Sequence, residues 1–471
     1  MSAETGCETS LPSSGTRCMC ARRRWCDPGV AAQNRADSMR LLGTDLELFL
    51  SSAKRWFMSD VFVVGTSMTR FGPFPDESVK SLTATAVTDV VADAGISLDR
   101  LQVAFFSNAS QDVIEGQTST PGQFALHSAG LAGLPVVNVE NGCASGSSAL
   151  WLAAAQVRSG AADYALAIGA EKMAFRDPDR RALVMEAFAG GLDRERATET
   201  VASLRSLGAD IAGDFGDGHR TMMMDVYAGL CRAHMARFGT TREQLAAIAS
   251  KNHTYASMND KCHYNKPMTA EEILAGRPLA YPLTVPMCSP LSDGAAAAIV
   301  TNRQGLRRLS LETQRRAVRV RACELRSATD RAWDEFDRHV IRRAAYAAYE
   351  AAGVGPGDVD VAEVHDAAAF GELFASELLG FCPIGEGGRL AESGATSIGG
   401  SIPINPSGGL VSRGHPIGAT GLAQIHELTT QLRGEAGARQ VDRARVAIQE
   451  NGGAFLGVEE AAAVVTILTA E

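Results

Sequence analysis

Apolar residues along the chain fall into short continuous runs that alternate with longer amphipathic segments. The continuous runs predict buried strands at 61–65, 103–108, 164–173 and 295–302. Segment 78–95 has apolar residues at helical spacing and ends at Gly95, which predicts a helix. Alternating strands and helices indicate an α/β fold with mixed or parallel sheets that are covered on both faces.

The second part of the chain repeats this order. Strand-like runs are found at 318–325, 446–455 and 461–468, and an amphipathic helix is predicted at 339–354. Segment 361–370 starts as a strand. Segment 136–160 reads as an apolar strand, a glycine turn and a long helix, and segment 404–437 reads as a glycine turn followed by a long helix. These two helices end at Gly160 and Gly434. The repetition predicts an internal duplication of a β/α unit with pseudo-twofold symmetry.

Two segments do not follow the repeat. Residues 1–57 are rich in Ser, Arg and Cys without a clear period, and their cysteines lack zinc-site spacing. We interpret them as a disordered extension or a misassigned start, because their acidic residues argue against a transit peptide. The Met-rich, polar stretch at about 174–290 predicts a loop domain inserted into an N-terminal half at 58–304. The C-terminal half is predicted at 305–471.

Composition narrows the class of protein. The 471 residues include 45 basic and 54 acidic side chains, and the net charge of -9 argues against a nucleic-acid binder. Ten cysteines without a CxxC pair argue against a disulfide scaffold and favour a reducing, cytoplasmic compartment. No apolar stretch reaches the ~18 residues of a membrane span. The 47 glycines cluster in short polar turns, a pattern typical of binding sites.

Three residues in such turns suggest acyl-transfer chemistry. Cys143 lies in NGCASGSS at a strand-to-helix turn, where the helix N-terminus is expected to lower the pKa of its thiol. The alternative is a small buried residue that packs under the helix. His415 lies in SRGHPIGATG, the matching turn of the other half, and His365 lies in EVHDAAAF. Together they would supply a nucleophile, a base and an oxyanion donor.

The motifs NGCASGSSAL, EVHDA and INPSGGLVSRGHPIGATGLAQ together resemble the thiolase superfamily, and most of all its sterol-carrier-protein-type members. The resemblance covers about Met58 to Glu471. It implies a five-layered α/β/α/β/α fold of two duplicated halves with an inserted loop domain. It also implies acyl-CoA substrates, coenzyme A as a co-substrate without a resident cofactor or metal, and a homodimer or a dimer of dimers.

The resemblance also implies roles for individual residues. Cys143 matches the acylated nucleophile, His415 the histidine that takes the thiol proton, and His365 a donor to the first oxyanion hole. The backbone N–H groups of Cys143 and Gly453 match the second oxyanion hole. Ser289, Asn451 and Gly414 complete the expected substrate contacts, with Ser289 placed against the pantetheine arm.

One feature departs from the family pattern. Thiolases that condense two acetyl groups use a second cysteine, either after the His-Asp pair or in a C-terminal CxG motif. Here Ala367 follows His365-Asp366, and the C-terminal segment reads ENGGAFLG. Cys288 and Cys382 are the leftover thiols, and neither is favoured as a replacement. The departing carbanion would then be protonated by His365, by water or by Glu450.

The leading hypothesis is an acyltransferase that cleaves or forms a β-ketoacyl-CoA through an acyl-Cys143 intermediate. The alternatives are a ketoacyl-synthase-like or retro-aldolase-like enzyme, favoured by the missing cysteine, and a non-catalytic acyl-CoA- or lipid-binding subunit. The resemblance adds a possible small partner protein with an OB-fold and a zinc ribbon. Lys261, His263 and Lys266 form either a solvated loop or a contact with the CoA phosphates.

Overall fold

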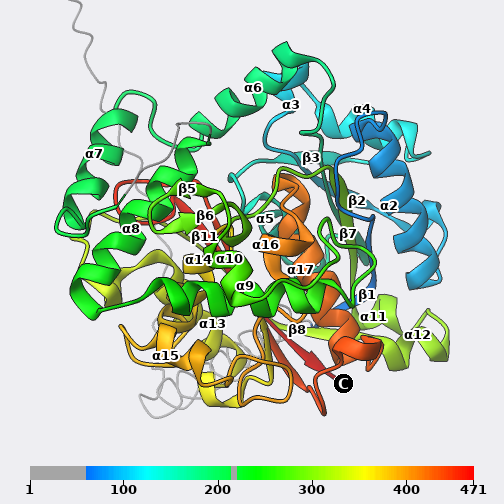
Figure 1. Cartoon of the computed structure of the whole chain (residues 1–471). Coiled ribbons are helices and arrows are strands. Elements are labelled where there is room, and N and C mark those ends of the chain that lie inside the picture. The colour runs from blue at the N-terminus through cyan, green and yellow to red at the C-terminus, as the bar shows by residue number, and fades with distance from the viewer. Residues whose placement is uncertain (1–59, 214–219) are drawn as a thin grey trace, which may run out of the picture. The chain divides into compact units, whose positions relative to one another are not determined.

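Nine strands form one hydrogen-bonded sheet in the order β3-β2-β4-β7-β1-β8-β11-β10-β9 (Figure 1). The computed structural model describes residues 60–213 and 220–471, so the prediction for residues 1–57 lies outside the described residues. The strands are β1 (Val61–Met68), β2 (Val103–Ser107), β3 (Val136–Val139), β4 (Tyr164–Glu171), β7 (Gly294–Asn302), β8 (Val318–Ser327), β9 (Val361–Glu363), β10 (Val446–Gly453) and β11 (Ala462–Ala470).

The predicted duplication is visible in the strand pairing. From the centre outwards, the first half runs β1, β7, β4, β2 and the second half β8, β11, β10, β9. In both halves each of the first three strands is antiparallel to its neighbour, and the fourth is parallel to the third. A parallel bridge between Ala362 and Ile404 stands in the position of β3. Strands β1 and β8 pair antiparallel and join the two β-layers edge to edge.

Helices cover both faces of each half and complete the five layers. Helices α5 (Ser145–Arg158) and α17 (Ile417–Leu432) pack against each other and against strands of both halves. Helix α2 (Val79–Ala94) covers the outer face of the first half, with α4 (Pro121–Ser128) beside it. Helix α13 (Val340–Ala352) covers the outer face of the second half, next to α14 (Ala369–Leu378). The predicted fold is confirmed.

Burial on both faces explains why the strands are continuous apolar runs. In β1, Val61 and Val63 enter the middle core beside α5 and α17, whereas Phe62 and Val64 enter the outer core beneath α2. Successive side chains of a strand point to opposite faces, so a strand with two covered faces requires an apolar residue at every position.

In its described residues, the segment between β4 and β7 carries five further α-helices and a two-stranded sheet, drawn in green in Figure 1. Its elements are α6 (Pro178–Ala189), α7 (Ala197–Leu207), α8 (Met222–Phe238), α9 (Arg242–Ala256), α10 (Ala270–Leu274), β5 (Pro278–Ala280) and β6 (Leu283–Thr284). Met223 and Met224 are buried in its core. The limits of the predicted domains stay predictions.

The other short helices lie in connections. They are α3 (Gln111–Glu115), α11 (Arg303–Leu306), α12 (Leu311–Arg316), α15 (Gly387–Glu392) and α16 (Gly409–Arg413). Among the described residues, no helix combines the length and the hydropathy needed to cross a membrane.

Candidate active site

Cys143 lies in a tight turn between β3 and α5. The turn is held by Ser145, whose hydroxyl accepts the backbone N–H of Asn141 at 2.8 Å. Gly142 has a φ of 55°, and a Cβ there would lie 2.8 Å from the backbone nitrogen of Ala454. Glycine therefore allows this turn to press against the end of β10, which brings Cys143 to the boundary between the two halves.

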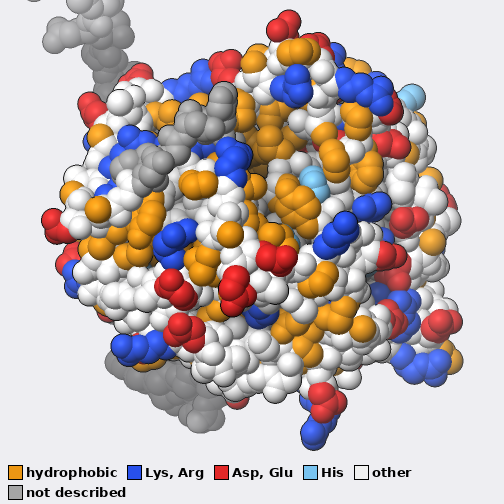
Figure 2. All heavy atoms as spheres, viewed as in Figure 1, with side chains coloured by type: hydrophobic (Ala, Val, Ile, Leu, Met, Phe, Trp, Pro, Cys, Tyr) orange, Lys and Arg blue, Asp and Glu red, His pale blue; other side chains and the backbone are white. Residues whose placement is uncertain are grey.

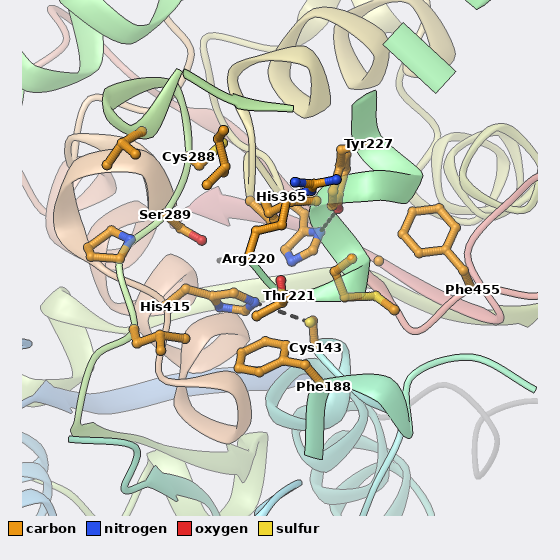
Figure 3. Close-up of a pocket in the computed structure, with 18 of the residues that line it drawn as sticks. Cys143, Phe188, Arg220, Thr221, Tyr227, Cys288, Ser289, His365, His415 and Phe455 are labelled. Atoms are coloured by element: carbon orange, nitrogen blue, oxygen red, sulfur yellow. Dashed lines mark hydrogen bonds between the residues drawn. The ribbon is translucent and has the colours of Figure 1, made fainter. Parts of the chain in front are cut away.

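His415 occupies the matching turn before α17 and faces Cys143 (Figure 3). Its Nε2 lies 3.1 Å from the Cys143 Sγ, and its Nδ1 lies 2.6 Å from the Thr420 Oγ1. The Thr420 hydroxyl donates its single proton to the Pro416 carbonyl at 2.9 Å, so it accepts from Nδ1–H. The lone pair of a neutral His415 ring is therefore on Nε2, directed at the thiol.

His365 follows β9 and approaches the same point from the second half. Its ring centre lies 5.2 Å from that of His415, and the ligand atoms of Cys143, His365 and His415 lie within 4.8 Å of one another. The hydroxyl of Tyr227 lies 3.4 Å from the His365 Nδ1 (Figure 3). When this hydroxyl donates to Nδ1, Nε2 carries the ring proton. That atom has no hydrogen-bond partner among the described residues.

Burial sets the charge state of the pair. It raises the pKa of the Cys143 thiol to about 12, and Glu171 and Glu140 add to the shift, whereas the amides of Ala454 and Cys143 oppose it. The expected lowering by the helix N-terminus is therefore wrong, because desolvation and two carboxylates outweigh a helix end. Burial also holds the pKa of His415 well below its usual value. The resting pair is a neutral thiol and a neutral imidazole.

The three side chains open into a cavity of about 250 Å³. Its walls are mainly apolar and include Met185, Phe188 and Phe455. Figure 2 shows hydrophobic side chains around a hollow near the middle of the face in view. Ser289, Gly453 and Cys288 line this cavity, and the contact of Ser289 and Gly453 with substrate stays a prediction.

The other two expected contacts lie behind the wall. The Oδ1 of Asn451 accepts a hydrogen bond from the Ser147 hydroxyl at 2.8 Å, and the residue is fully buried. At Gly414 a Cβ would lie 2.5 Å from the Ser292 Oγ. Neither residue is part of the cavity lining, so their predicted contact with substrate stays a prediction.

The Lys261–Lys266 loop is held by contacts inside the protein. The Lys261 ammonium donates to the Met68 carbonyl at 2.5 Å, and the His263 Nδ1 lies 2.8 Å from the Ser292 Oγ. Tyr264 is the residue of this loop that lines the cavity.

Comparison with known families accounts for most of the described chain. The family described as "Thiolase, N-terminal domain" matches residues 61–272, and "Thiolase C-terminal domain-like" matches residues 324–469. The chain belongs to the thiolase family. "Sterol carrier protein 2" of Oryctolagus cuniculus is 37% identical over 419 residues, which cover 86% of this chain and 71% of that protein.

Two further relatives of this thiolase carry enzyme names. "Acetyl-CoA acetyltransferase" of Methanothermobacter thermautotrophicus is 38% identical over 84% of this chain and 97% of its own length. "Benzoylsuccinyl-CoA thiolase subunit BbsB" of Thauera aromatica is 30% identical over 81% of this chain and 91% of its own length. The relatives indicate an acyltransferase-type enzyme.

A solved structure supports the fold. The complex titled "Ltp2-ChsH2(DUF35) aldolase" contains a chain with a TM-score of 0.68, which covers 87% of this thiolase and 98% of that chain. The sequence identity is 21%, so the likeness concerns the fold alone.

Several residues at the site do not belong to a recognisable sequence motif. Tyr227, on α8, and Glu460, just before β11, line the cavity of this thiolase. Nothing near them in the sequence distinguishes them from core or loop residues. Glu450, one of the three proton donors considered for the carbanion, accepts the backbone N–H of His365 at 2.9 Å and is not part of the lining. Thr420 could have been found from the sequence, because it lies five residues after His415, in the first turn of the helix that follows it.

Proposed function

We propose that this thiolase transfers acyl groups between coenzyme A thioesters, through an acyl thioester on Cys143, and so cleaves or forms a β-ketoacyl-CoA. The observation that carries the proposal is the 3.1 Å contact between the Cys143 Sγ and the His415 Nε2. Thr420 and Pro416 fix the ring so that its lone pair faces the thiol. Such a pair delivers a thiolate only when a substrate carbonyl is in place.

In the cleavage direction, the Cys143 sulfur attacks the β-carbonyl carbon while its proton passes to the His415 Nε2. The Nε2–H of His365 and the backbone amides near the sulfur stabilise the oxyanion. The bond between the α- and β-carbons then breaks, which leaves the shortened acyl group on Cys143. The electron pair of that bond forms the enolate of the leaving acyl-CoA, acetyl-CoA for an unbranched substrate, and this enolate takes up a proton. The thiol of free CoA finally attacks the acyl-Cys143 carbonyl and gives up its proton to the group that protonated the enolate. The released Cys143 sulfur takes back the proton held on the His415 Nε2.

The apolar cavity favours an acyl group larger than acetyl, since methionine and phenylalanine side chains gain from contact with hydrocarbon. Coenzyme A is the co-substrate, and no resident cofactor or metal takes part in these steps. The Cys143, His365 and His415 donor set would also attract soft metal ions. Added Zn²⁺ is therefore expected to inhibit, and a chelator to leave the activity intact.

A second candidate is a carbon–carbon lyase of the aldolase type, or a condensing enzyme of the ketoacyl-synthase type. Ala367 after His365-Asp366 and Gly452-Gly453 at the end of β10 favour it, because neither position offers a second thiol. Such a lyase would cleave a β-hydroxyacyl-CoA without free CoA. A non-catalytic acyl-CoA-binding subunit would handle its ligand equally well without Cys143.

We also propose a homodimer or dimer of dimers in the cytoplasm, with a small OB-fold, zinc-ribbon partner protein. The names of two similar proteins support a partner protein. The solved complex with the same fold pairs its chain with a DUF35 protein, and the Thauera relative is called a subunit.

The deciding experiment is intact-mass analysis after incubation with a mixed pool of acyl-CoAs. We expect one acyl adduct on the wild type, mapped to Cys143, and none on Cys143→Ala. Turnover that depends on free CoA supports the thiolase, whereas cleavage of a β-hydroxyacyl-CoA without CoA supports the lyase. If no acyl-CoA labels the wild type, the acyl-cysteine mechanism is wrong.

A further inference from the structure

The proposed reaction requires one proton transfer that the Cys143–His415 pair does not supply. When the carbon–carbon bond breaks, the enolate carbon needs a proton, and in the reverse direction the same α-carbon must lose one. His415 holds the proton taken from Cys143 during the attack and returns it to the sulfur when CoA displaces the acyl group. A second acid–base group in contact with the cavity is therefore required.

The ionisable side chains that line the cavity can be compared for this task. Burial raises the pKa of Tyr227 well above its usual value and that of Cys288 to about 12. Burial lowers the pKa of His365 to about 4, so its ring is neutral and donates through N–H only. The arginines stay protonated. Glu460 is the one carboxyl group among the described residues of the lining.

Glu460 differs from its neighbour Glu459 in the hydrogen bonds that its carboxyl group makes. The neighbouring Glu459 is neutralised, because it accepts from the Arg331 Nε at 2.8 Å and from the Val340 backbone N–H at 2.7 Å. By contrast, the Oε2 of Glu460 has no hydrogen-bond partner among the described residues. Its side chain is 10% exposed, and it lines the cavity. Two adjacent acids thus have different surroundings, and only one of them is free to react.

The nearest ring to Glu460 is His339, whose Nε2 lies 3.6 Å from the Glu460 Oε2. The His339 Nδ1 accepts the backbone N–H of Ile341 at 3.3 Å, and burial holds the pKa of this ring well below its usual value. The neutral ring therefore carries its proton on Nε2, which faces the carboxyl group without a full positive charge. This arrangement orients Glu460 and leaves it able to take up and release a proton.

The missing side chain at position 452 makes room for this carboxyl group. A Cβ on Gly452 would lie 2.7 Å from the Glu460 Cγ and 3.3 Å from its Cδ. Gly452 itself lines the cavity at the end of β10, beside the turn that presents Cys143. A glycine in the C-terminal segment therefore lets an acid from the next connection reach the reaction cavity.

We propose that Glu460 is the acid–base residue that moves the α-proton in the reaction proposed above. In cleavage its carboxylic acid protonates the enolate carbon and becomes a carboxylate. In condensation the carboxylate removes a proton from the α-carbon, and the resulting enolate attacks the acyl-Cys143 carbonyl. This assignment rests on the proposed acyl-Cys143 chemistry. Burial raises the pKa of Glu460 to about 7, where both of its forms are available at neutral pH.

The two half-reactions can be measured separately. Acylation of Cys143 is followed by intact mass, and α-proton transfer is followed as deuterium uptake at Cα of acetyl-CoA and hexanoyl-CoA in D₂O. We expect Glu460→Gln to acylate within about 3-fold of the wild type but to exchange the α-proton about 100-fold more slowly. Glu460→Asp should keep more of the exchange. Glu77→Gln, at an exposed glutamate, is the matched control and should leave both rates unchanged.

A second variant tests the position of the carboxyl group without removing it. Gly452→Ala should displace Glu460 and lower the exchange about 10-fold, which also covers the case that Glu460→Gln does not fold. Exchange that survives Glu460→Gln, exchange lost in Cys288→Ala instead, or a wild type that acylates but does not exchange would each overturn the assignment. Failure of the wild type to acylate would instead reject the proposed function itself.

Discussion

At the scale of single residues, Cys143 and His415 form a neutral pair at the wall of the cavity. Helix N-termini and histidines usually favour a thiolate, but here burial and the carboxylates Glu171 and Glu140 favour the protonated thiol. The enzyme would thus create its nucleophile during the reaction. This also explains why the ring of His415 is fixed by Thr420, since a neutral imidazole must present the correct nitrogen.

The charge state of Cys143 predicts its reactivity with iodoacetamide. Because burial raises the thiol pKa to about 12, alkylation of Cys143 should accelerate about 10-fold per pH unit from pH 6 to 9 without a plateau. Peptide mass spectrometry after timed quenching measures this rate. A thiolate–imidazolium pair would instead react at a nearly constant rate above pH 7, and that profile would contradict the neutral pair.

At the scale of elements, the site depends on how closely α5 and α17 approach. Cys143 precedes α5 and His415 precedes α17, so the distance between the helix starts fixes the distance between nucleophile and base. The approach requires glycine, because a Cβ on Gly421 would lie 2.7 Å from the Ser147 nitrogen and 2.5 Å from the Asn451 Oδ1. Asn451 therefore contributes as packing beneath the helices.

Gly421→Ala should push the two helices apart. We expect a loss of roughly 1–3 kcal/mol in unfolding free energy from overpacking. We also expect about a 100-fold slower acylation of Cys143, because small displacements of reacting groups are costly. Thermal unfolding and intact mass measure the two effects. Gly357→Ala is the control, since a Cβ there meets nothing within 4 Å. Equal acylation by both variants would contradict this account.

At the scale of the whole molecule, folding buries an unusual set of acids between its layers. Burial raises the pKa of Glu450 to about 8 and those of Glu171 and Glu460 to about 7. These acids bind protons more tightly in the folded than in the unfolded chain, so their stabilising contribution is complete at low pH and is lost as the pH rises through these values. Buried histidines such as His365 have the opposite effect, because their loss of a proton makes the folded protein more stable as the pH rises. This effect is limited to pH values below about 6.5.

The protein should therefore become less stable between pH 6.5 and 8.5. The three acids predict a loss of roughly 2–3 kcal/mol over this range, visible as a falling melting temperature. Glu450→Gln should flatten the dependence, because the side chain can no longer ionise. A melting temperature that stays constant or rises up to pH 8.5 would show that these carboxyl groups are not held in their protonated form.

Local patterns in the chain predicted the strands of the large sheet, the helices α2, α5, α13 and α17, and the duplication, and they pointed to Cys143, His365 and His415 as candidate site residues. Continuous apolar runs indicate strands that are buried on both faces, and glycine turns before long helices indicate close backbone approach. Both signals are contained in a few neighbouring residues. Only the tertiary structure decided the protonation state of the Cys143 thiol and the packing role of Asn451. It also decided that Tyr227 and Glu460 line the cavity. Desolvation and contacts between distant segments exist only after the layers pack, and no local pattern encodes them.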